Sequence, residues 1–285
     1  MKGPTARQKL TDRVSVTLQQ ETVFAGTIKT TYLSTVIGVP VVLLHGAGEG
    51  AVGWYPVIDP LSAHFRVIAP DVVGYGESDK PSAPYDHPYF SAWLGEFLDA
   101  LHLQKINLVG TSQGGAISIQ FALDNPERID KLVLVDSAAL GGNGIAIGAL
   151  VGLLWRNTFP SRAASHWLRR YCVYDQENID EALADYKNEV CRKAGGKRAF
   201  WQGRGRTAAP VPLEQLAQVT HETLIIWGKE DRFFPLSHAQ AAQRVMANGR
   251  LHVIPKASHV PYFDQPEEFN DELIRFLGDA ESVDP

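Results

Sequence analysis

The chain of 285 residues is poor in cysteine and methionine, with two of each, and it has no long apolar run. Its longest apolar stretch, residues 144–155, is shorter than the roughly 20 residues that a membrane-spanning helix needs. The first ten residues carry charges without an apolar segment, so we predict no signal peptide. Two thiols without an export signal, Cys172 and Cys191, favour reduced side chains, although the two could pair. We therefore expect a cytoplasmic protein without membrane contact.

The chain also has no excess of positively charged residues. The net charge is −5 and the isoelectric point is near 6.0, which argues against nucleic acid or an anionic membrane as a partner. No histidine, cysteine and aspartate have metal-ligand spacing, and no Walker A loop or dinucleotide fingerprint is present. We expect a small-molecule substrate, no cofactor and no metal, with monomer and homodimer both open.

What the chain does contain is a regular alternation of strand and helix patterns. Short apolar runs alternate with helical periodicity over residues 1–137 and again over 210–285, which predicts a mostly parallel sheet with right-handed crossovers. Residues 138–209 show helical patterns only, so we expect a helical cap inserted into an α/β core. We further expect a loose terminus at 1–12, edge strands at 14–17 and 28–33, and a helix capped by Ser237.

The chain is organised around a serine between glycines. Gly110, Ser112 and Gly114 form G-x-S-x-G, with a strand pattern before the serine and a helical pattern after it. A turn sharp enough to expose the serine strains its backbone and needs small neighbours, and Gly115 would let the helix pack close to the sheet. The unpaired amides at the start of the helix favour a negative charge beside the serine.

Two further side chains follow later strands at the same sheet edge. Asp231 and His259 come after the carboxyl ends of predicted strands, where parallel sheets bind ligands. A serine hydroxyl needs a base to become a nucleophile, so we expect His259 to accept the proton of Ser112 and Asp231 to fix the tautomer of His259. Asp136, at the end of the preceding strand, remains an alternative acid.

A glycine-rich loop, residues 45–50, follows another buried strand. The amides of such a loop can turn toward one point, so we predict an oxyanion hole from the backbone N–H groups of Ala47 and Gln113. His45 is expected to support the loop without transferring protons. Asp71 is expected to have a structural role, accepting hydrogen bonds from turn amides.

Taken together, the loop at 45–50, the elbow around Ser112, the turn at 228–231 and His259 resemble the α/β-hydrolase superfamily over nearly the whole chain. Within it, the chain resembles carboxylesterases and the meta-cleavage-product hydrolases, which hydrolyse C–C bonds in dienone acids. Serine at position 112 differs from the aspartate nucleophile of haloalkane dehalogenases and epoxide hydrolases. The chain departs from the usual C–C hydrolase pattern at Thr111, Gln113 and Val260, where that family has Asn, Met and Trp.

Three functions follow in order of expectation. The first is a serine hydrolase that cleaves largely apolar carboxylic esters through an acyl-enzyme. The second is a C–C bond hydrolase of 2-hydroxy-6-oxo-dienoates with the same triad, and the third is a ligand receptor without turnover. Residues 144–155 either line a substrate tunnel or pack on the core. The cap arginines that could grip a substrate carboxylate, unless they are only exposed helix residues, are Arg192, Arg198, Arg204 and Arg206.

Overall fold

The structure is a computed structural model that describes residues 3–142, 144–178, 180–207 and 209–279. Its strands form one eight-stranded sheet in the order β1-β2-β4-β3-β5-β6-β7-β8. The pairs β1·β2 and β2·β4 are antiparallel and the other five are parallel, so the mostly parallel sheet is confirmed. The strands are β1 (Gln19–Ala25), β2 (Ile28–Ser34), β3 (Val39–Leu44), β4 (Phe65–Pro70), β5 (Ile106–Thr111), β6 (Ile129–Val135), β7 (Glu222–Gly228) and β8 (Gly249–Ile254).

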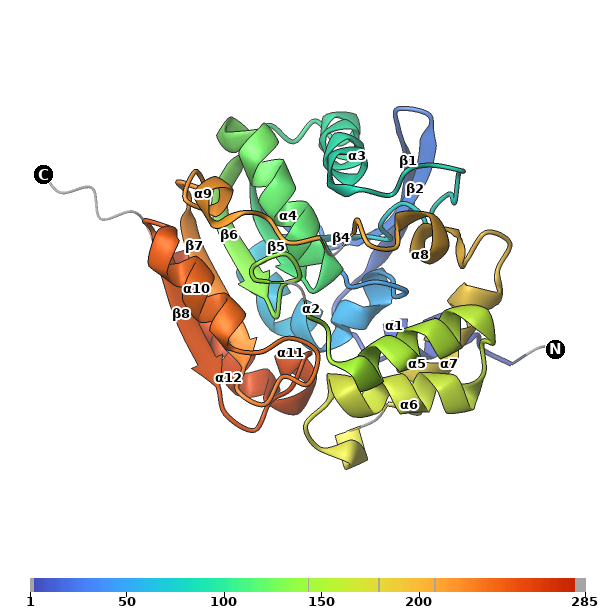
Figure 1. The fold of residues 1–285 in the computed structure, drawn as a ribbon. Helices are drawn as coiled ribbons and strands as arrows, with labels where there is room; N and C mark the ends of the chain where they lie inside the picture. Colours follow the sequence, from blue (N-terminus) through green and yellow to red (C-terminus); the bar gives the residue numbers. More distant parts are fainter. Residues whose placement is uncertain (1–2, 143, 179, 208, 280–285) are drawn as a thin grey trace, which may run out of the picture.

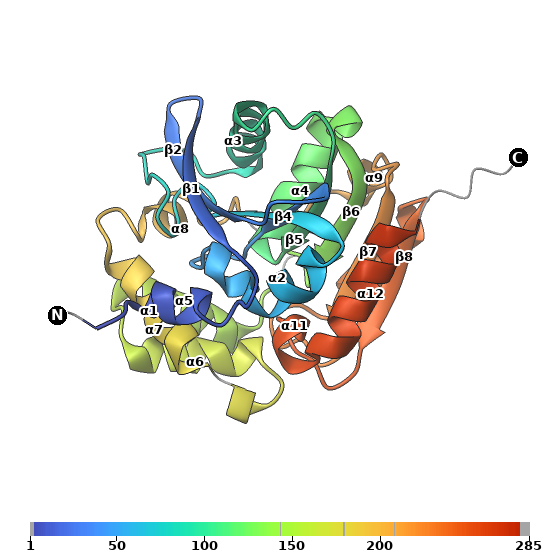
Figure 2. The ribbon, with the colours of Figure 1, turned by 180° about the vertical axis from the view of Figure 1, so that it is seen from behind.

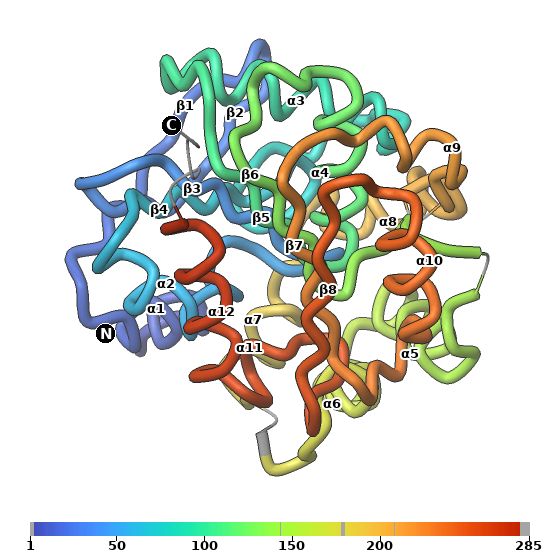
Figure 3. The backbone as a smooth tube through the Cα atoms, turned by 90° about the vertical axis from the view of Figure 1, so that its left-hand side faces the viewer, coloured from blue at the N-terminus to red at the C-terminus, as the bar shows by residue number. Residues whose placement is uncertain are grey.

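Helices cover both faces of this sheet. Helices α4 and α10 lie in front of it in Figure 1, and α2 and α12 lie in front when the molecule is seen from behind in Figure 2. Figure 3 shows α10 and α12 on opposite sides of β8. The core helices are α2 (Tyr55–Ser62), α3 (His87–Ala100), α4 (Gln113–Asp124), α9 (Leu213–Leu216), α10 (Ser237–Val245), α11 (Pro261–Asp264) and α12 (Pro266–Gly278), and the 3₁₀ turns are η1 (Ala51–Trp54), η2 (Pro126–Arg128) and η3 (Gln176–Asn178).

The central strands are buried along almost their whole length because helices cover both of their faces. Every residue of β5 is buried, and β6 is buried except for Asp130. Such strands need apolar side chains at consecutive positions, which is the composition of residues 108–109 and 132–135. This rigid centre positions the loops at the carboxyl ends of the strands.

The segment between β6 and β7 is helical, as predicted. Besides α9, its α-helices are α5 (Ile147–Thr158), α6 (Arg162–Cys172), α7 (Glu181–Arg192) and α8 (Arg198–Gly203). Helices α5, α6 and α7 lie together beside the core in Figures 1 and 2. The division of the chain at residues 138 and 209 into core and cap remains a prediction.

The N-terminal expectations were wrong in two places. Residues Ala6–Thr11 form helix α1, which packs against α7; Thr5 and Gln8 form a capping box at its start, a signal readable from the sequence. Residues 14–17 form no strand, because the amides of Ser15 and Val16 donate to the carboxylate of Asp59 instead.

Ser237 is the first residue of α10 rather than its N-cap, which is Leu236. Cys172 and Cys191 are both buried free thiols. Within the described ranges no helix combines the length and the apolar character that crossing a bilayer requires.

Candidate active site

The elbow predicted from the glycine pattern joins β5 directly to α4. Ser112 has φ 52° and ψ −116°, a region that residues with a side chain seldom adopt and that stores strain. A Cβ on Gly114 would lie 2.2 Å from the carbonyl oxygen of Leu44 in β3, and one on Gly110 would lie 2.3 Å from the carbonyl oxygen of Gly114. Only glycine fits at these positions, and Gly115 is equally confined, against Ser137.

A continuous series of hydrogen bonds runs from Ser112 to Asp231. The Nε2 atom of His259 lies 2.9 Å from Ser112 Oγ, and its Nδ1 atom lies 3.0 Å from Asp231 Oδ2. The other oxygen of Asp231 accepts from the backbone N–H of Phe233 at 2.6 Å. The ring of Phe233 stacks on the imidazole with centroids 4.3 Å apart. The three residues predicted from separate loops therefore meet, and the imidazole is held from two sides.

Asp136, the alternative acid, lies beside Asp231 and His259 but accepts its hydrogen bond from another group. Its Oδ1 atom accepts from the backbone N–H of Gly228 at 3.0 Å, whereas the hydrogen bond of His259 Nδ1 goes to Asp231. Burial and the neighbouring charge of Asp231 raise the pKa of Asp136 well above its ordinary value. The geometry thus favours Asp231 over Asp136 as the partner of the histidine.

The glycine-rich loop lies directly against the serine. A Cβ on Gly46 would come within 3.4 Å of Ser112 Cβ, and Ala47 and Gln113 line the same pocket as Ser112 and His259. Gln113 is the first residue of α4, where backbone N–H groups lack intrahelical partners. The loop and the helix start therefore approach the serine together, as an oxyanion hole requires.

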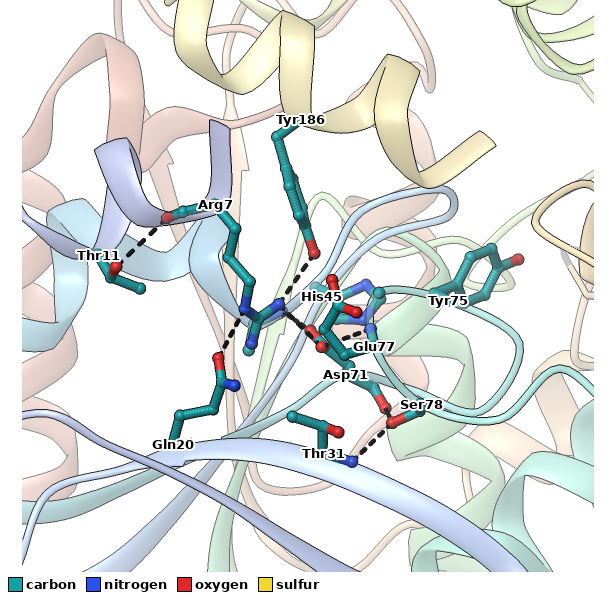
Figure 4. A network of polar contacts seen from close by, with 12 residues as sticks. Arg7, Thr11, Gln20, Thr31, His45, Asp71, Tyr75, Glu77, Ser78 and Tyr186 are labelled. Carbon is teal, nitrogen blue, oxygen red and sulfur yellow. Dashed lines mark hydrogen bonds and ion pairs between the residues drawn. The ribbon is translucent and has the colours of Figure 1, made fainter. Parts of the chain in front are cut away.

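Beneath this loop lies a polar network that includes Asp71 (Figure 4). The Asp71 carboxylate accepts from the backbone N–H groups of Ala51 at 2.6 Å and Glu77 at 2.8 Å, which confirms its predicted role in bonding turn amides. It also pairs at 2.9 Å with Arg7 of α1, whose guanidinium donates to the hydroxyl of Tyr186 on α7. The network ties α1 and α7 to the base of the loop.

His45 supports the loop, as expected. Its Nε2 atom accepts from the backbone N–H of Val72 at 2.9 Å, and its Nδ1 atom lies 2.8 Å from the carbonyl oxygen of Gly46, to which it donates. Burial lowers the pKa of His45 to about 4. The ring is thus neutral at physiological pH and has both nitrogens engaged, which removes it from proton transfer.

A pocket of about 620 Å³ opens over Ser112 and His259. Much of its wall is apolar and comes from the segment that follows β6 and from the loop after β7. The apolar lining residues from these parts include Ile145, Leu150, Leu153, Leu154, Phe233 and Phe234. Both interpretations of residues 144–155 hold in part: the segment lines this pocket, and Ala149 packs in the apolar core. Ile147 and Val151 are exposed.

The pocket wall also contains charged side chains that were not predicted from the sequence. Lys187 of α7 forms a buried ion pair with Glu49 of the glycine-rich loop. Burial lowers the pKa of Lys187 to about 7. Arg156 of α5 is 2% exposed and lies against the loop, since a Cβ on Gly48 would be 2.2 Å from its Nη2 atom.

Arg156 has few partners. Its Nη2 atom donates to the carbonyl oxygen of Ala47 at 3.3 Å, and its Nε atom is buried without a hydrogen bond. Among the residues that the structure describes, no carboxylate forms an ion pair with it, because Glu49 pairs with Lys187. A buried guanidinium without an acidic partner favours the binding of a ligand that carries an anionic group.

The arginines selected from the sequence lie elsewhere. All four are exposed, and only Arg204 lines the pocket, with its guanidinium over the ring of Trp201. The carbonyl oxygens of Pro160, Lys80 and Gln202 accept from Arg192, Arg198 and Arg206, respectively. The helical spacing of Ala149, Gly152 and Arg156, which form the buried face of α5, was the available signal for Arg156.

The described residues contain one cluster with the spacing of metal ligands, and it consists of Asp136, Asp231 and His259. Both nitrogens of His259 are already engaged, by Ser112 and Asp231. These hydrogen bonds are those of a proton-transfer series, and a serine on a strand–turn–helix elbow completes it. Fold and site together define a serine hydrolase.

Comparison with known proteins gives the family. The family described as alpha/beta hydrolase fold matches residues 39–167. The 2-hydroxy-6-oxo-2,4-heptadienoate hydrolase of Pseudomonas putida is 33% identical over 269 residues, which are 90% of this chain and 94% of that protein. The chain belongs to the α/β-hydrolase family.

Two solved structures are similar over nearly their whole length. A meta-cleavage product hydrolase from Pseudomonas fluorescens, a mutant complexed with acetates, has a TM-score of 0.83 and 29% identity and covers 90% of this chain and 97% of its own. A carboxylesterase from Bacillus subtilis has a TM-score of 0.88 and covers 96% and 97%, but at 19% identity it shows the fold alone.

Proposed function

We propose that this serine hydrolase cleaves a carbon–carbon bond in a 2-hydroxy-6-oxo-2,4-dienoic acid. The observation that carries the proposal is the hydrogen-bonded series from Ser112 to Asp231. It lies in a pocket with an apolar wall and a buried guanidinium that has no ion-pair partner among the described residues. The names of the hydrolases from Pseudomonas specify this type of reaction, and these proteins match nearly the whole chain. The proposal reverses the order of the two substrate classes expected from the sequence.

Each residue has a role in the proposed reaction. Ser112 Oγ attacks the ketone carbonyl while its proton passes to His259 Nε2, and Asp231 stabilises the imidazolium. The backbone N–H groups of Ala47 and Gln113 donate to the oxyanion, and one such donor contributes roughly 3–4 kcal/mol in the transition state. The bond to the adjacent carbon then breaks, that carbon takes the proton from His259, and water releases the acid from the serine ester.

The charge distribution of the pocket supports an acid as substrate. A dienoic acid has a carboxylate at one end and the ketone substituent at the other. Arg156, with the nearby Lys187–Glu49 pair, supplies a charged part of the pocket wall, and Leu150, Leu153 and Leu154 supply an apolar part. A neutral ester would leave the guanidinium of Arg156 buried without a counter-charge, which is costly.

Carboxylic ester hydrolysis is the second candidate. Thr111, Gln113 and Val260 favour it, because they replace residues usual in the C–C hydrolases that this chain resembles. The same series of side chains would act through the same acyl-enzyme. Both reactions need no cofactor.

The deciding experiment measures kcat/KM for both substrate classes with one preparation. A ring-cleavage dienone acid is followed by the loss of its absorbance, beside p-nitrophenyl acetate and butyrate. A higher kcat/KM for the dienone acid supports the proposal, and dominant ester turnover reverses it. Ser112→Ala serves as the control, since it should abolish both activities.

Three further expectations from the sequence belong to this proposal. We propose that residues 138–209 act as a cap over the pocket, since α5 supplies much of its apolar wall. We also propose a small, partly apolar acid as the partner, without nucleic acid or membrane. A cytoplasmic location fits such a substrate and two buried free thiols.

A further inference from the structure

Two carboxyl groups lie side by side next to the imidazole of His259. One oxygen of Asp136, one of Asp231 and a nitrogen of His259 all lie within 4.8 Å of one another. The side chain of Asp231 is fully buried, and so is Asp136 as a whole residue. Two buried carboxylates this close cannot both be ionised, because each charge raises the free energy of the other and no water screens them.

The number of N–H donors decides which group keeps the charge. Asp231 accepts from two, the backbone N–H of Phe233 at 2.6 Å and the Nδ1–H of His259 at 3.0 Å. Asp136 accepts from one, the backbone N–H of Gly228, and its Oδ2 atom is buried without a donor among the described residues. A carboxylate is stabilised by each donor it accepts from, so the negative charge belongs on Asp231 and the shared proton on Asp136.

We propose that Asp136 is a positioning residue that stays protonated in the working enzyme and donates a hydrogen bond from its carboxyl group to Asp231. This inference rests on the proposed function in one respect, the role of Asp231 in orienting His259. It assigns Asp136 a function other than that of an alternative triad acid.

The electrostatic surroundings agree with this assignment. The titratable groups around Asp136 include Asp231, His259, and Asp264 and Tyr262 on α11, and the two carboxylates both oppose its ionisation. Burial acts in the same direction and raises the pKa of Asp136 well above its ordinary value. The single N–H of Gly228 opposes these effects without cancelling them.

The backbone holds Asp136 in place. Its φ of 39° lies in the left-handed region, and its N–H donates to the carbonyl oxygen of Ile226 at 3.0 Å. Aspartate and asparagine tolerate this conformation better than other residues with a side chain. Asparagine is therefore a close replacement, since its oxygen can accept from Gly228 and its amide can donate to Asp231.

The proposed bond does two things for catalysis. It gives Asp231 a third donor, which fixes the carboxylate with one oxygen toward His259. It also keeps a second negative charge away from the imidazole. Such a charge would hold the proton on His259 more tightly and oppose its transfer to the leaving group.

The test compares wild type, Asp136→Asn and Asp136→Ala in pH profiles of kcat and kcat/KM, on p-nitrophenyl acetate and on the dienone acid. We expect Asp136→Ala to lose roughly 10-fold or more in kcat, the effect of one hydrogen bond to a charged group. Asp136→Asn should recover most of that loss and keep the acid limb of the profile in place. A shift of the acid limb to lower pH in Asp136→Asn would mean that a negative charge was removed, and the proposal would be wrong. Full activity of Asp136→Ala would contradict it equally.

Two measurements do not depend on turnover. The infrared difference spectrum between wild type and Asp136→Asn at neutral pH should contain the carbonyl band of a protonated carboxylic acid; carboxylate bands alone would overturn the proposal. The unfolded chain releases the proton of Asp136 above about pH 4, whereas the folded chain keeps it, so wild type loses stability as the pH rises. The Tm of Asp136→Asn relative to the Tm of wild type should therefore increase as the pH rises from about 4 to 7.

The control is Asp71, another buried aspartate, which has a cationic partner. Asp71→Asn breaks the ion pair with Arg7 and should lower the Tm at neutral pH, in contrast to Asp136→Asn. A Tm gap for Asp136→Asn that stays constant with pH would contradict the proposal. Failure to hydrolyse the dienone acid would bear on the proposed substrate alone, because the comparison of the variants on p-nitrophenyl acetate and by infrared spectroscopy would still decide the state of Asp136.

Discussion

Replacing Arg156 with methionine should separate acid substrates from neutral ones. The guanidinium lies in the pocket against the glycine-rich loop, 2% exposed, with one long hydrogen bond to Ala47 and no carboxylate partner among the described residues. Methionine has a similar length and no charge, so the variant removes the electrostatic contact without leaving a large cavity. The expected result is a selective loss of activity on substrates that carry a carboxylate.

The magnitude follows from the burial of the charge. A hydrogen bond to a charged group contributes roughly 1.5–3 kcal/mol, which corresponds to a factor of about 10 to 150. A screened surface pair would contribute about 1 kcal/mol or less, so the low exposure of Arg156 places the effect in the higher range. We expect kcat/KM for the dienone acid to fall by this factor and kcat/KM for p-nitrophenyl acetate to change much less.

The assay compares four proteins on both substrates. Arg156→Lys should keep part of the activity, since lysine supplies a charge but not the planar pair of donors. Arg204→Met is the matched control, because Arg204 lines the same pocket but is exposed and lies over Trp201. The Tm of Arg156→Met should not fall, since the variant removes an uncompensated buried charge. An equal loss on both substrates, or no loss on the acid, would refute the reasoning.

Three other predictions follow from the site. Ser112→Ala should abolish labelling by a fluorophosphonate probe, and labelling that persists would place the nucleophile elsewhere. Asp231→Asn should lower turnover by orders of magnitude (about 10⁴ for the loss of a triad acid); retained activity would show that another group orients His259. The pKa of His45 is lowered to about 4, so as the pH falls His45 is protonated in the unfolded chain before it is protonated in the folded chain. The free energy of unfolding should therefore fall by up to about 3 kcal/mol as the pH is lowered from 6.5 to 4. Denaturant titrations of His45→Gln should lack that part of the loss, and an unchanged pH dependence would contradict the assignment.

Much of the fold could be predicted because its signals are local. Buried parallel strands need consecutive apolar residues. The elbow needs glycine where a Cβ would lie 2.2 Å from a carbonyl oxygen. Both requirements can therefore be recognised from residues that are neighbours in the sequence. The errors at the N-terminus have a physical cause as well. Residues 14–17 look like a strand, but the amides of Ser15 and Val16 bond to Asp59, which is distant in sequence.

The amino-acid sequence by itself determined the elbow, the chain order of Ser112, Asp231 and His259, and the class of chemistry they allow. Only the tertiary structure decided between Asp231 and Asp136, since both follow strands at the same sheet edge and differ in which one faces Nδ1 of His259. It also showed that the four arginines selected from the sequence are exposed, whereas Arg156 is buried against the glycine-rich loop, which supports the proposed contact with a substrate carboxylate. The burial of Arg156 and its lack of an acidic partner among the described residues depend on how the chain packs, so they cannot be read from the composition.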